Sequence, residues 1–336
     1  MNAPATSQKT KKKEYDKEHL HELLHTMILI RRYEEKAAEL YQATKIRGFL
    51  HLYIGEEAIA TGIMSVLTPE DSILCTYREH GHALARGVSA DTIMAEMYGK
   101  VTGCARGRGG SMHLFDKEHR FFGGNAIVCS HLPLAVGFAL ADKMQNKPNV
   151  TVCFLGEGAV AEGEFHESLN MGALWQTPTL FVVENNLYCM GTALQYTESN
   201  PNIWEKGAAY NVKSVRVDGN DVLAMEEAAR EACDYLRSGK GPFLMEAMTY
   251  RFRPHSMFDA ELYRDKAEVQ EAKKRDPIIL FTNYLKDKKL IKDEEIQAME
   301  KDVAGTVQKA VDFAENSPWE DIADLTKFVT TERSQP

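Results

Sequence analysis

Two short apolar segments of the sequence each end in residues that can bind a metal ion. The first, 150–155, runs into Gly156-Glu157-Gly158, and the second, 180–183, runs into Glu184-Asn185-Asn186. Glu157 offers a carboxylate, Asn186 an amide oxygen, and the chain beyond Asn186 backbone carbonyls. Hard oxygen ligands of this kind suit Mg²⁺, which completes its shell with phosphate oxygens and water. The sequence therefore predicts a diphosphate ligand bridged by magnesium.

The segments around these residues explain how they come together. A helical pattern, about 162–175, separates the two apolar segments, so we predict a strand–helix–strand unit with parallel strands and a right-handed crossover. Open parallel sheets bind ligands at the carboxyl ends of their strands. Gly158 and Ala159 follow the first strand, where small residues let the backbone approach a phosphate at a helix N-terminus.

The rest of the chain extends this pattern to an α/β fold. Residues 213–217 and 243–249 are typical of strands, and the helix Val222–Arg237 lies between them. Residues 121–137 are expected to run from a Gly-Gly turn into a helix of small residues. We predict a mainly parallel sheet flanked by helices, with an N-terminal helix at about 15–46 and a C-terminal helical extension from about 262. The expected organisation is a disordered arm, 1–13, and a single domain, 14–330.

The composition and charge of the chain argue against several classes of function. The chain has 336 residues, 44% of them hydrophobic, and a net charge of −9, which argues against a nucleic-acid or membrane-surface role. Its apolar runs are too short for a transmembrane helix. The six cysteines show no paired spacing, so we interpret them as reduced thiols of a cytoplasmic protein.

The segment Gly156–Asn186 resembles the thiamine diphosphate motif, a Gly-Asp-Gly turn followed by Asn-Asn. The sequence segments GEFHESLNMGALW and ENNLYCMGT, which belong to this region, are similar to segments of the alpha subunits of the thiamine-dependent first component of pyruvate dehydrogenase complexes, in the 2-oxo acid dehydrogenase family. The resemblance covers residues from about 20 to about 280. Glu157 is a departure, because the family has Asp at this position.

The resemblance implies a thiamine diphosphate-binding fold and assigns roles to particular residues. Magnesium would be held by Glu157, Asn186 and the carbonyl of Tyr188. The diphosphate would be held by Tyr77, Arg78, Gly158 and Ala159, and backbone groups at Ala126 and Val128 would touch the aminopyrimidine ring. His51 and His255 would bind the cofactor and work near the reacting centre, where an imidazole can exchange protons at neutral pH.

Some of these segments also have simpler explanations. A lone histidine such as His51 is more often structural, and Tyr77-Arg78 alone could belong to a surface turn rich in ion pairs. The glycine-rich loop 103–113 is weak evidence for phosphate binding by itself, and its role is open. His131 could face the same site or serve in capping or packing.

The function implied by the resemblance is that of the alpha subunit of a pyruvate dehydrogenase (acetyl-transferring). It would decarboxylate pyruvate oxidatively and pass the acetyl unit to a lipoyl group of the acetyltransferase component. The implied partners are a beta subunit, in an alpha2beta2 heterotetramer, and the lipoyl domain. Branched-chain 2-oxo acids or acetoin are alternative substrates. A nonenzymatic nucleotide-binding regulator is a remote alternative, because no dinucleotide or P-loop fingerprint follows an early strand.

Overall fold

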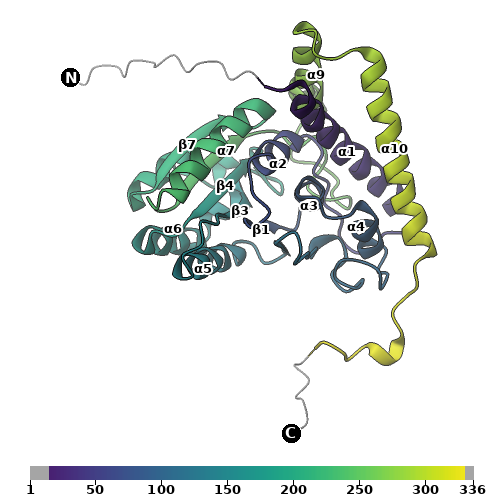
Figure 1. Cartoon of the computed structure of the whole chain (residues 1–336), viewed down its shortest axis with the longest axis horizontal. Coiled ribbons are helices and arrows are strands. Elements are labelled where there is room, and N and C mark those ends of the chain that lie inside the picture. Colours follow the sequence, from purple (N-terminus) through teal and green to yellow (C-terminus); the bar gives the residue numbers. More distant parts are fainter. Residues whose placement is uncertain (1–14, 330–336) are drawn as a thin grey trace.

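A six-stranded parallel sheet forms the centre of the molecule (Figure 1). The computed structural model describes residues 15–329, so the predicted arm 1–13 lies outside the described residues. The strand order is β2-β1-β3-β4-β8-β7, and every neighbouring pair is parallel. The strands are β1 (Ser72–Thr76), β2 (Phe121–Asn125), β3 (Thr151–Gly156), β4 (Thr179–Asn185), β7 (Lys213–Asp218) and β8 (Phe243–Met248). The predicted α/β class with a mainly parallel sheet is confirmed.

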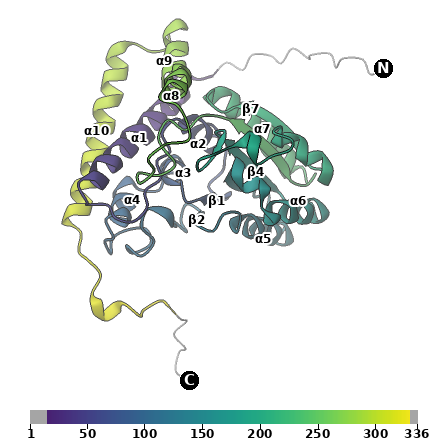
Figure 2. The same cartoon turned by 180° about the vertical axis from the view of Figure 1, so that it is seen from behind.

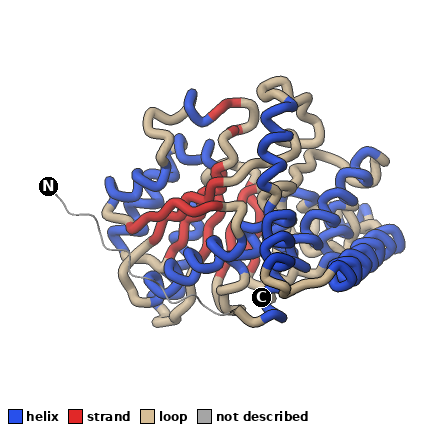
Figure 3. Tube along the Cα trace, turned by 90° about the horizontal axis from the view of Figure 1, so that it is seen from above, coloured by secondary structure: helices blue, strands red, loops and turns tan. Residues whose placement is uncertain are grey.

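Helices cover both faces of this sheet (Figure 3). Successive side chains of a strand point to opposite faces, and β3 shows the result. Val152 and Phe154 pack into one core with α1 (Lys17–Gln42), α2 (Glu57–Met64) and α7 (Val222–Arg237). Cys153 and Leu155 pack into a second core with α5 (His131–Met144) and α6 (Gly163–Trp175). A strand buried on both faces has a continuous apolar sequence, which is why the sequence alone predicted strand β3.

The predicted strand–helix–strand unit is β3-α6-β4. Its strands pair in register from Thr151 opposite Thr179 to Gly156 opposite Glu184, so Glu157 and Asn186 leave the sheet at the same edge. The second predicted unit, β7-α7-β8, is also parallel. Both units therefore deliver their loops to the carboxyl edge of the sheet.

The expectation for residues 121–125 was wrong, because the segment with Gly123 and Gly124 is strand β2 and not a turn. Glycine is depleted in strands, and this misled the sequence interpretation. The structure gives the reason for Gly124: a Cβ there would lie 2.1 Å from Oε1 of Glu79. The glycine therefore makes room for the buried carboxylate of Glu79.

The C-terminal helices follow the sheet, and the longest of them packs along the N-terminal helix (Figures 1 and 2). They are α8 (Lys266–Ala272), α9 (Pro277–Asp287) and α10 (Asp293–Asn316), and two short helices, α3 (His80–Arg86) and α4 (Ala90–Met97), lie nearby. Arg32 of α1 and Glu300 of α10 form a salt bridge at 2.7 Å. After α10, Trp319 pairs with Lys100. Within residues 15–329, no helix combines the length and apolarity needed to cross a membrane.

Candidate functional site

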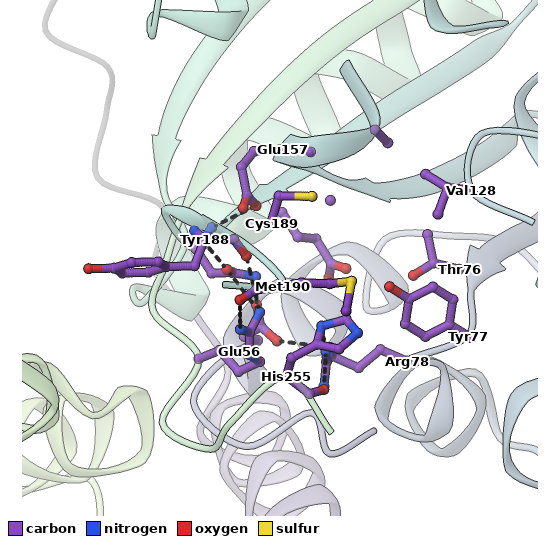
Figure 4. Close-up of a pocket in the computed structure, with 16 residues that line it drawn as sticks. Glu56, Thr76, Tyr77, Arg78, Val128, Glu157, Tyr188, Cys189, Met190 and His255 are labelled. Carbon is purple, nitrogen blue, oxygen red and sulfur yellow. Dashed lines mark hydrogen bonds and ion pairs between the residues drawn. The ribbon is translucent and has the colours of Figure 1, made fainter. Parts of the chain in front are cut away.

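A cleft opens at the carboxyl edge of the sheet, where the ends of four strands contribute residues (Figure 4). Thr76 ends β1, Gly156 ends β3, Glu184 lies near the end of β4, and Arg251 follows β8. The space between these groups, including the open mouth, is about 580 Å³. From β1 the chain continues to β2 on one side of the sheet, and from β3 it continues to β4 on the other side. Open α/β sheets bind ligands at such a point, between two neighbouring strands whose connections run in opposite directions.

The cleft brings together most of the residues singled out in the sequence. Its walls include Tyr77, Arg78, Val128, Glu157, Gly158, Ala159, Asn186, Tyr188 and His255. His51 lies directly behind this wall, with its ring centroid 4.5 Å from that of Tyr77 and 5.0 Å from that of His255. Ala126 does not line the cleft and is exposed to solvent.

Glu157 is buried at the floor of the cleft, with 1% of its surface exposed. One carboxylate oxygen, Oε2, accepts a long hydrogen bond of 3.3 Å from the backbone N–H of Asn186. The other, Oε1, has no hydrogen-bond partner among the described residues. Burial raises the pKa of this carboxyl, and its own backbone hydrogen bond and Arg251 oppose the rise. An unpartnered buried carboxylate is costly, so the site is suited to a cation.

Arg251 is the buried cation nearest to the other predicted metal ligands. Its Nη1 donates to Oδ1 of Asn186 at 3.1 Å and to the carbonyl oxygen of Tyr188 at 3.4 Å. Its Nη2 donates to the carbonyl oxygen of Met190 at 3.4 Å. The guanidinium therefore binds the same two oxygens that the sequence assigns to magnesium. The sequence prediction did not include this arginine.

The aromatic ring of Tyr188 takes no part in the cleft. Figure 4 shows the ring turned away from the other labelled side chains, and its hydroxyl donates to Glu268 of α8 at 2.9 Å. The backbone carbonyl of Tyr188 instead accepts a hydrogen bond from Arg251, and its role as a metal ligand stays a prediction. Among residues 15–329, no cluster of three or more His, Cys, Asp or Glu side chains is arranged to hold a metal. A metal here depends on the mixed set of carboxylate, amide and carbonyl oxygens, which fits Mg²⁺.

A second buried carboxylate, Glu56, stands beside Asn186. It is 1% exposed, and its Oε1 accepts a hydrogen bond from Nδ2 of Asn186 at 3.1 Å. Its Oε2 lies 4.0 Å from Nε of Arg78. Burial raises the pKa of Glu56 to about 7, although the Arg78 guanidinium opposes the rise. Glu56 thus links the predicted diphosphate arginine to the predicted metal ligand.

Arg78 is buried, and its guanidinium ties two segments together. Nη1 donates to the carbonyl oxygen of Leu52 at 2.9 Å, and Nη2 donates to the carbonyl oxygen of His255 at 2.8 Å. Burial lowers the pKa of Arg78, with Arg251 adding to the effect. Arg78 and Arg251 can each pair with an anionic group, in a cleft that the carboxylates of three glutamates also line.

The two histidines and Tyr77 form a compact aromatic group at the side of the cleft. Burial, together with Arg78, lowers the pKa of His51 to about 2 and that of His255 to about 3. In the chain alone both imidazoles are therefore neutral at pH 7, and the expectation that they exchange protons there requires an anionic ligand or partner to raise the pKa. Nδ1 of His51 is buried without a hydrogen-bond partner among the described residues.

The backbone at Gly158 comes close to its surroundings. A Cβ there would lie 2.1 Å from Sγ of Cys189, which also lines the cleft. Glu157–Ala161 forms a single 3₁₀ turn between β3 and α6. Gly158 therefore allows the side chain of Cys189 to pack directly against the backbone of this turn.

The glycine-rich loop 103–113 binds a side chain of the protein itself. The carboxylate of Glu96, which is fully buried, accepts hydrogen bonds from four backbone N–H groups of this loop at 2.7–3.1 Å; the donors are Ala105, Gly107, Gly109 and Gly110. These N–H groups are arranged as in an anion-binding loop. Their anion is internal, so the loop needs no phosphate ligand to satisfy them.

Residues 126–128 and His131 have different surroundings. Ile127 and Val128 are 71% and 41% exposed, so this segment presents apolar side chains to solvent at the rim of the cleft. His131 is buried, and its Nε2 lies 2.8 Å from the carbonyl oxygen of Phe154 in β3. His131 therefore has the packing role that the sequence left as one of two possibilities.

Glu56 and Arg251 are site residues that the sequence analysis did not identify, and it gave Glu184 no role of its own. Glu184 accepts hydrogen bonds from the hydroxyl of Tyr53 and pairs with Nε2 of His82 at 3.0 Å. Both glutamates stand next to segments that were already singled out, but nothing in the sequence alone shows that they are buried. Charged residues at the end of predicted buried strands are the signal that could have found Glu184.

Comparison with known proteins agrees with this geometry. Residues 25–323 match the dehydrogenase E1 component family. The chain is 46% identical to the pyruvate dehydrogenase E1 component subunit alpha-3, chloroplastic, of Arabidopsis thaliana, over 88% of this chain and 71% of the relative. It is 42% identical to the pyruvate dehydrogenase E1 component subunit alpha of Rhizobium meliloti, over 93% and 90% of the two chains. The corresponding subunit of Zymomonas mobilis is also 42% identical, over 90% and 86%. The chain belongs to the family of dehydrogenase E1 components.

Proposed function

We propose that this chain is the alpha subunit of a pyruvate dehydrogenase (acetyl-transferring) that uses thiamine diphosphate and magnesium. The observation that carries the proposal is the unpartnered buried oxygen of Glu157 beside Asn186, at the ends of β3 and β4. The relatives of this chain are named as alpha subunits of the pyruvate dehydrogenase E1 component. When bound, thiamine diphosphate supplies the electron sink for breaking the bond between the carbonyl carbon and the carboxylate of a 2-oxo acid.

In this proposal, Glu157, Asn186 and the Tyr188 carbonyl hold magnesium. The support is their common place at the cleft floor and the hard-oxygen chemistry that they share. Arg251 has to release Asn186 Oδ1 when the metal arrives, because Arg251 and the Tyr188 N–H already use both lone pairs of that oxygen. Repulsion between the guanidinium and the metal ion would also move Arg251 off the Tyr188 carbonyl. The Met190 carbonyl stays available to the guanidinium.

The groups proposed for the diphosphate and the reacting centre line the same cleft. Tyr77 and Arg78 supply donors from the end of β1, and Gly158 and Ala159 supply backbone from the turn after β3. His51 and His255 stand next to Arg78 as neutral imidazoles, each with one N–H to donate. A bound diphosphate would add negative charge near both rings and raise each pKa toward the neutral range.

The proposal includes a beta subunit as partner and the lipoyl domain of an acetyltransferase component as acyl acceptor. The segment with Ile127 and Val128 supports a partner subunit, because it exposes apolar side chains at the mouth of the cleft. A partner bound there would shield these side chains and the cofactor ring from water. Ala126 and Val128 would contact the aminopyrimidine through their backbone. We place the enzyme in the cytoplasm as part of the same proposal, since all six cysteines are free thiols.

The first prediction concerns activity. The purified chain alone should not decarboxylate pyruvate, and co-expression with its beta subunit should give an alpha2beta2 enzyme that does, in the presence of thiamine diphosphate and Mg²⁺. Dye-coupled oxidation of pyruvate, branched-chain 2-oxo acids and acetoin, measured on one preparation, ranks the substrates. Turnover of pyruvate by the isolated chain, or a clear preference for another substrate, would contradict the proposal.

The second prediction concerns His255. Replacement by Ala should leave the fold intact, because the hydrogen bonds of His255 to Arg78 and Asp259 are made mainly by its backbone carbonyl and N–H. Transfer of the acetyl unit to a lipoyl domain should fall on the order of a hundredfold or more, which is the usual contribution of a positioned acid–base group.

The matched control is His119→Ala, at a half-exposed histidine that precedes β2 at the opposite edge of the sheet. It should keep normal lipoyl transfer. Near-normal transfer by His255→Ala in the assembled enzyme would show that His255 has no role in this step.

The third prediction concerns Glu157, which is one methylene longer than the Asp of the family. Mg²⁺ requires near-ideal octahedral geometry, so the longer side chain has to bend or shift the 3₁₀ turn that carries it. We expect Glu157→Asp to tighten the binding of magnesium and thiamine diphosphate by about tenfold, the lower end of what perturbed metal surroundings cost. Titrations of both into the assembled enzyme measure this. Equal or weaker binding by the Asp variant would show that the turn already accommodates the glutamate.

A further inference from the structure

Glu56 combines burial with contacts to two residues of the proposed cofactor site. It lines the cleft and is 1% exposed. Oε1 accepts a hydrogen bond from Nδ2 of Asn186 at 3.1 Å, and Oε2 faces Nε of Arg78 at 4.0 Å. Oε2 has no hydrogen-bond partner among the described residues. The proposed function gives this carboxylate no task of its own.

We propose that Glu56 is a positioning residue that fixes which end of the Asn186 amide faces the metal. The inference rests on the proposed function, because that function makes Asn186 Oδ1 a metal ligand. Glu56 itself does not touch the metal in this account. It acts through the hydrogen bond to Asn186.

The chemistry of the two side chains sets the orientation. An asparagine amide has an oxygen and an NH₂ of nearly equal size, so shape alone does not distinguish its two orientations. In its ionised form, which the nearby Arg78 guanidinium favours, the Glu56 carboxylate only accepts hydrogen bonds and therefore selects the NH₂ end of Asn186. The oxygen then points the other way, where it accepts from the backbone N–H of Tyr188 at 3.3 Å and from Nη1 of Arg251 at 3.1 Å.

The selection becomes more important when a metal binds. Asn186 Oδ1 has two lone pairs, and in the structure Tyr188 N–H and Arg251 use them. A metal ion takes the lone pair that Arg251 holds, so one of the two donors that favour this orientation is lost. Glu56 lies on the far side of the amide and keeps its bond. It would therefore be the main group that prevents the NH₂ end from turning toward the metal.

The fold holds Glu56 firmly in this place. The preceding residue, Gly55, has a φ of +107°, and a Cβ there would lie 2.4 Å from the carbonyl oxygen of Tyr250. The backbone N–H of Phe252 donates to the carbonyl of Ile54 at 3.0 Å. The turn that carries Glu56 is thus clamped against the segment that follows β8, and the carboxylate has little freedom to follow a moving Asn186.

The test compares Glu56→Gln with Glu56→Leu in the enzyme assembled with its beta subunit. Mn²⁺ in the presence of thiamine diphosphate serves as the probe, and the loss of the free Mn²⁺ signal in electron paramagnetic resonance gives its affinity. Gln retains an oxygen that can accept the bond from Asn186, so its affinity should stay within a few-fold of wild type. Leu removes the acceptor and should weaken Mn²⁺ binding about ten- to hundredfold, as the loss of groups that orient ligands does.

Asn186→Ala separates this inference from the proposed function. If Asn186→Ala leaves the Mn²⁺ affinity unchanged, Asn186 is not a ligand and the proposed site is wrong. If Asn186→Ala weakens binding and Glu56→Leu does not, the positioning role of Glu56 is wrong while the site stands. Equal losses in Gln and Leu would also overturn it, because the charge and not the acceptor would then matter.

A variant that fails to assemble does not end the test. Glu56→Asp keeps the charge and polarity but withdraws the acceptor by one methylene, so it should weaken Mn²⁺ binding while Glu56→Gln does not. Wild-type affinity in Glu56→Asp would contradict the proposal. The melting temperature of the metal-free complex, measured for each variant, separates a loss of the Asn186 orientation from a loss of folding.

Discussion

Charge compensation among buried groups is the constraint on which this site depends. The parallel sheet brings the ends of β1, β3, β4 and β8 to one edge, and the loops there bury the carboxylates of Glu56, Glu157 and Glu184 beside the guanidinium groups of Arg78 and Arg251. A buried charge is costly unless it is paired and hydrogen-bonded. Each of these groups therefore restricts the positions that the others can take.

Arg251 shows how the chain meets this constraint. Its guanidinium binds the Asn186 amide oxygen and two backbone carbonyls of the following loop. These oxygens would otherwise converge without a cation. The arginine thus holds the loop after β4 in place, and in the proposed function the cost of metal binding would include the release of two of its hydrogen bonds. The carboxylate of Glu157, with one unpartnered oxygen, would offset that cost if it binds the proposed metal.

Local patterns were sufficient to predict much of this architecture. The apolar runs of β3 and β4 and the polar residues after them predicted the parallel unit and the edge at which Glu157 and Asn186 meet. β2 was missed because Gly124, which the nearby carboxylate of Glu79 requires, resembles a turn residue in the sequence.

The partners of the site residues could not be predicted in the same way. The contact of Arg251 with Asn186 spans 65 residues and that of Glu56 with Asn186 spans 130, so no local pattern records them. The lowered pKa of His51 and His255 likewise follows from burial and from Arg78, which only the folded chain brings next to both rings. Residue types and strand ends were therefore predictable, whereas protonation and hydrogen-bond partners required the tertiary structure.

The central claim is that a metal and a diphosphate bind at this edge of the sheet in place of the Arg251 contacts. The most direct measurement is a crystal structure of the assembled enzyme with thiamine diphosphate and Mn²⁺, in which anomalous scattering locates the metal. The account predicts Mn²⁺ bound to the Glu157 carboxylate, Asn186 Oδ1 and the Tyr188 carbonyl, with the Arg251 guanidinium moved off both of the latter oxygens. Mn²⁺ at another place, or Arg251 still hydrogen-bonded to both oxygens beside a bound cofactor, would contradict it.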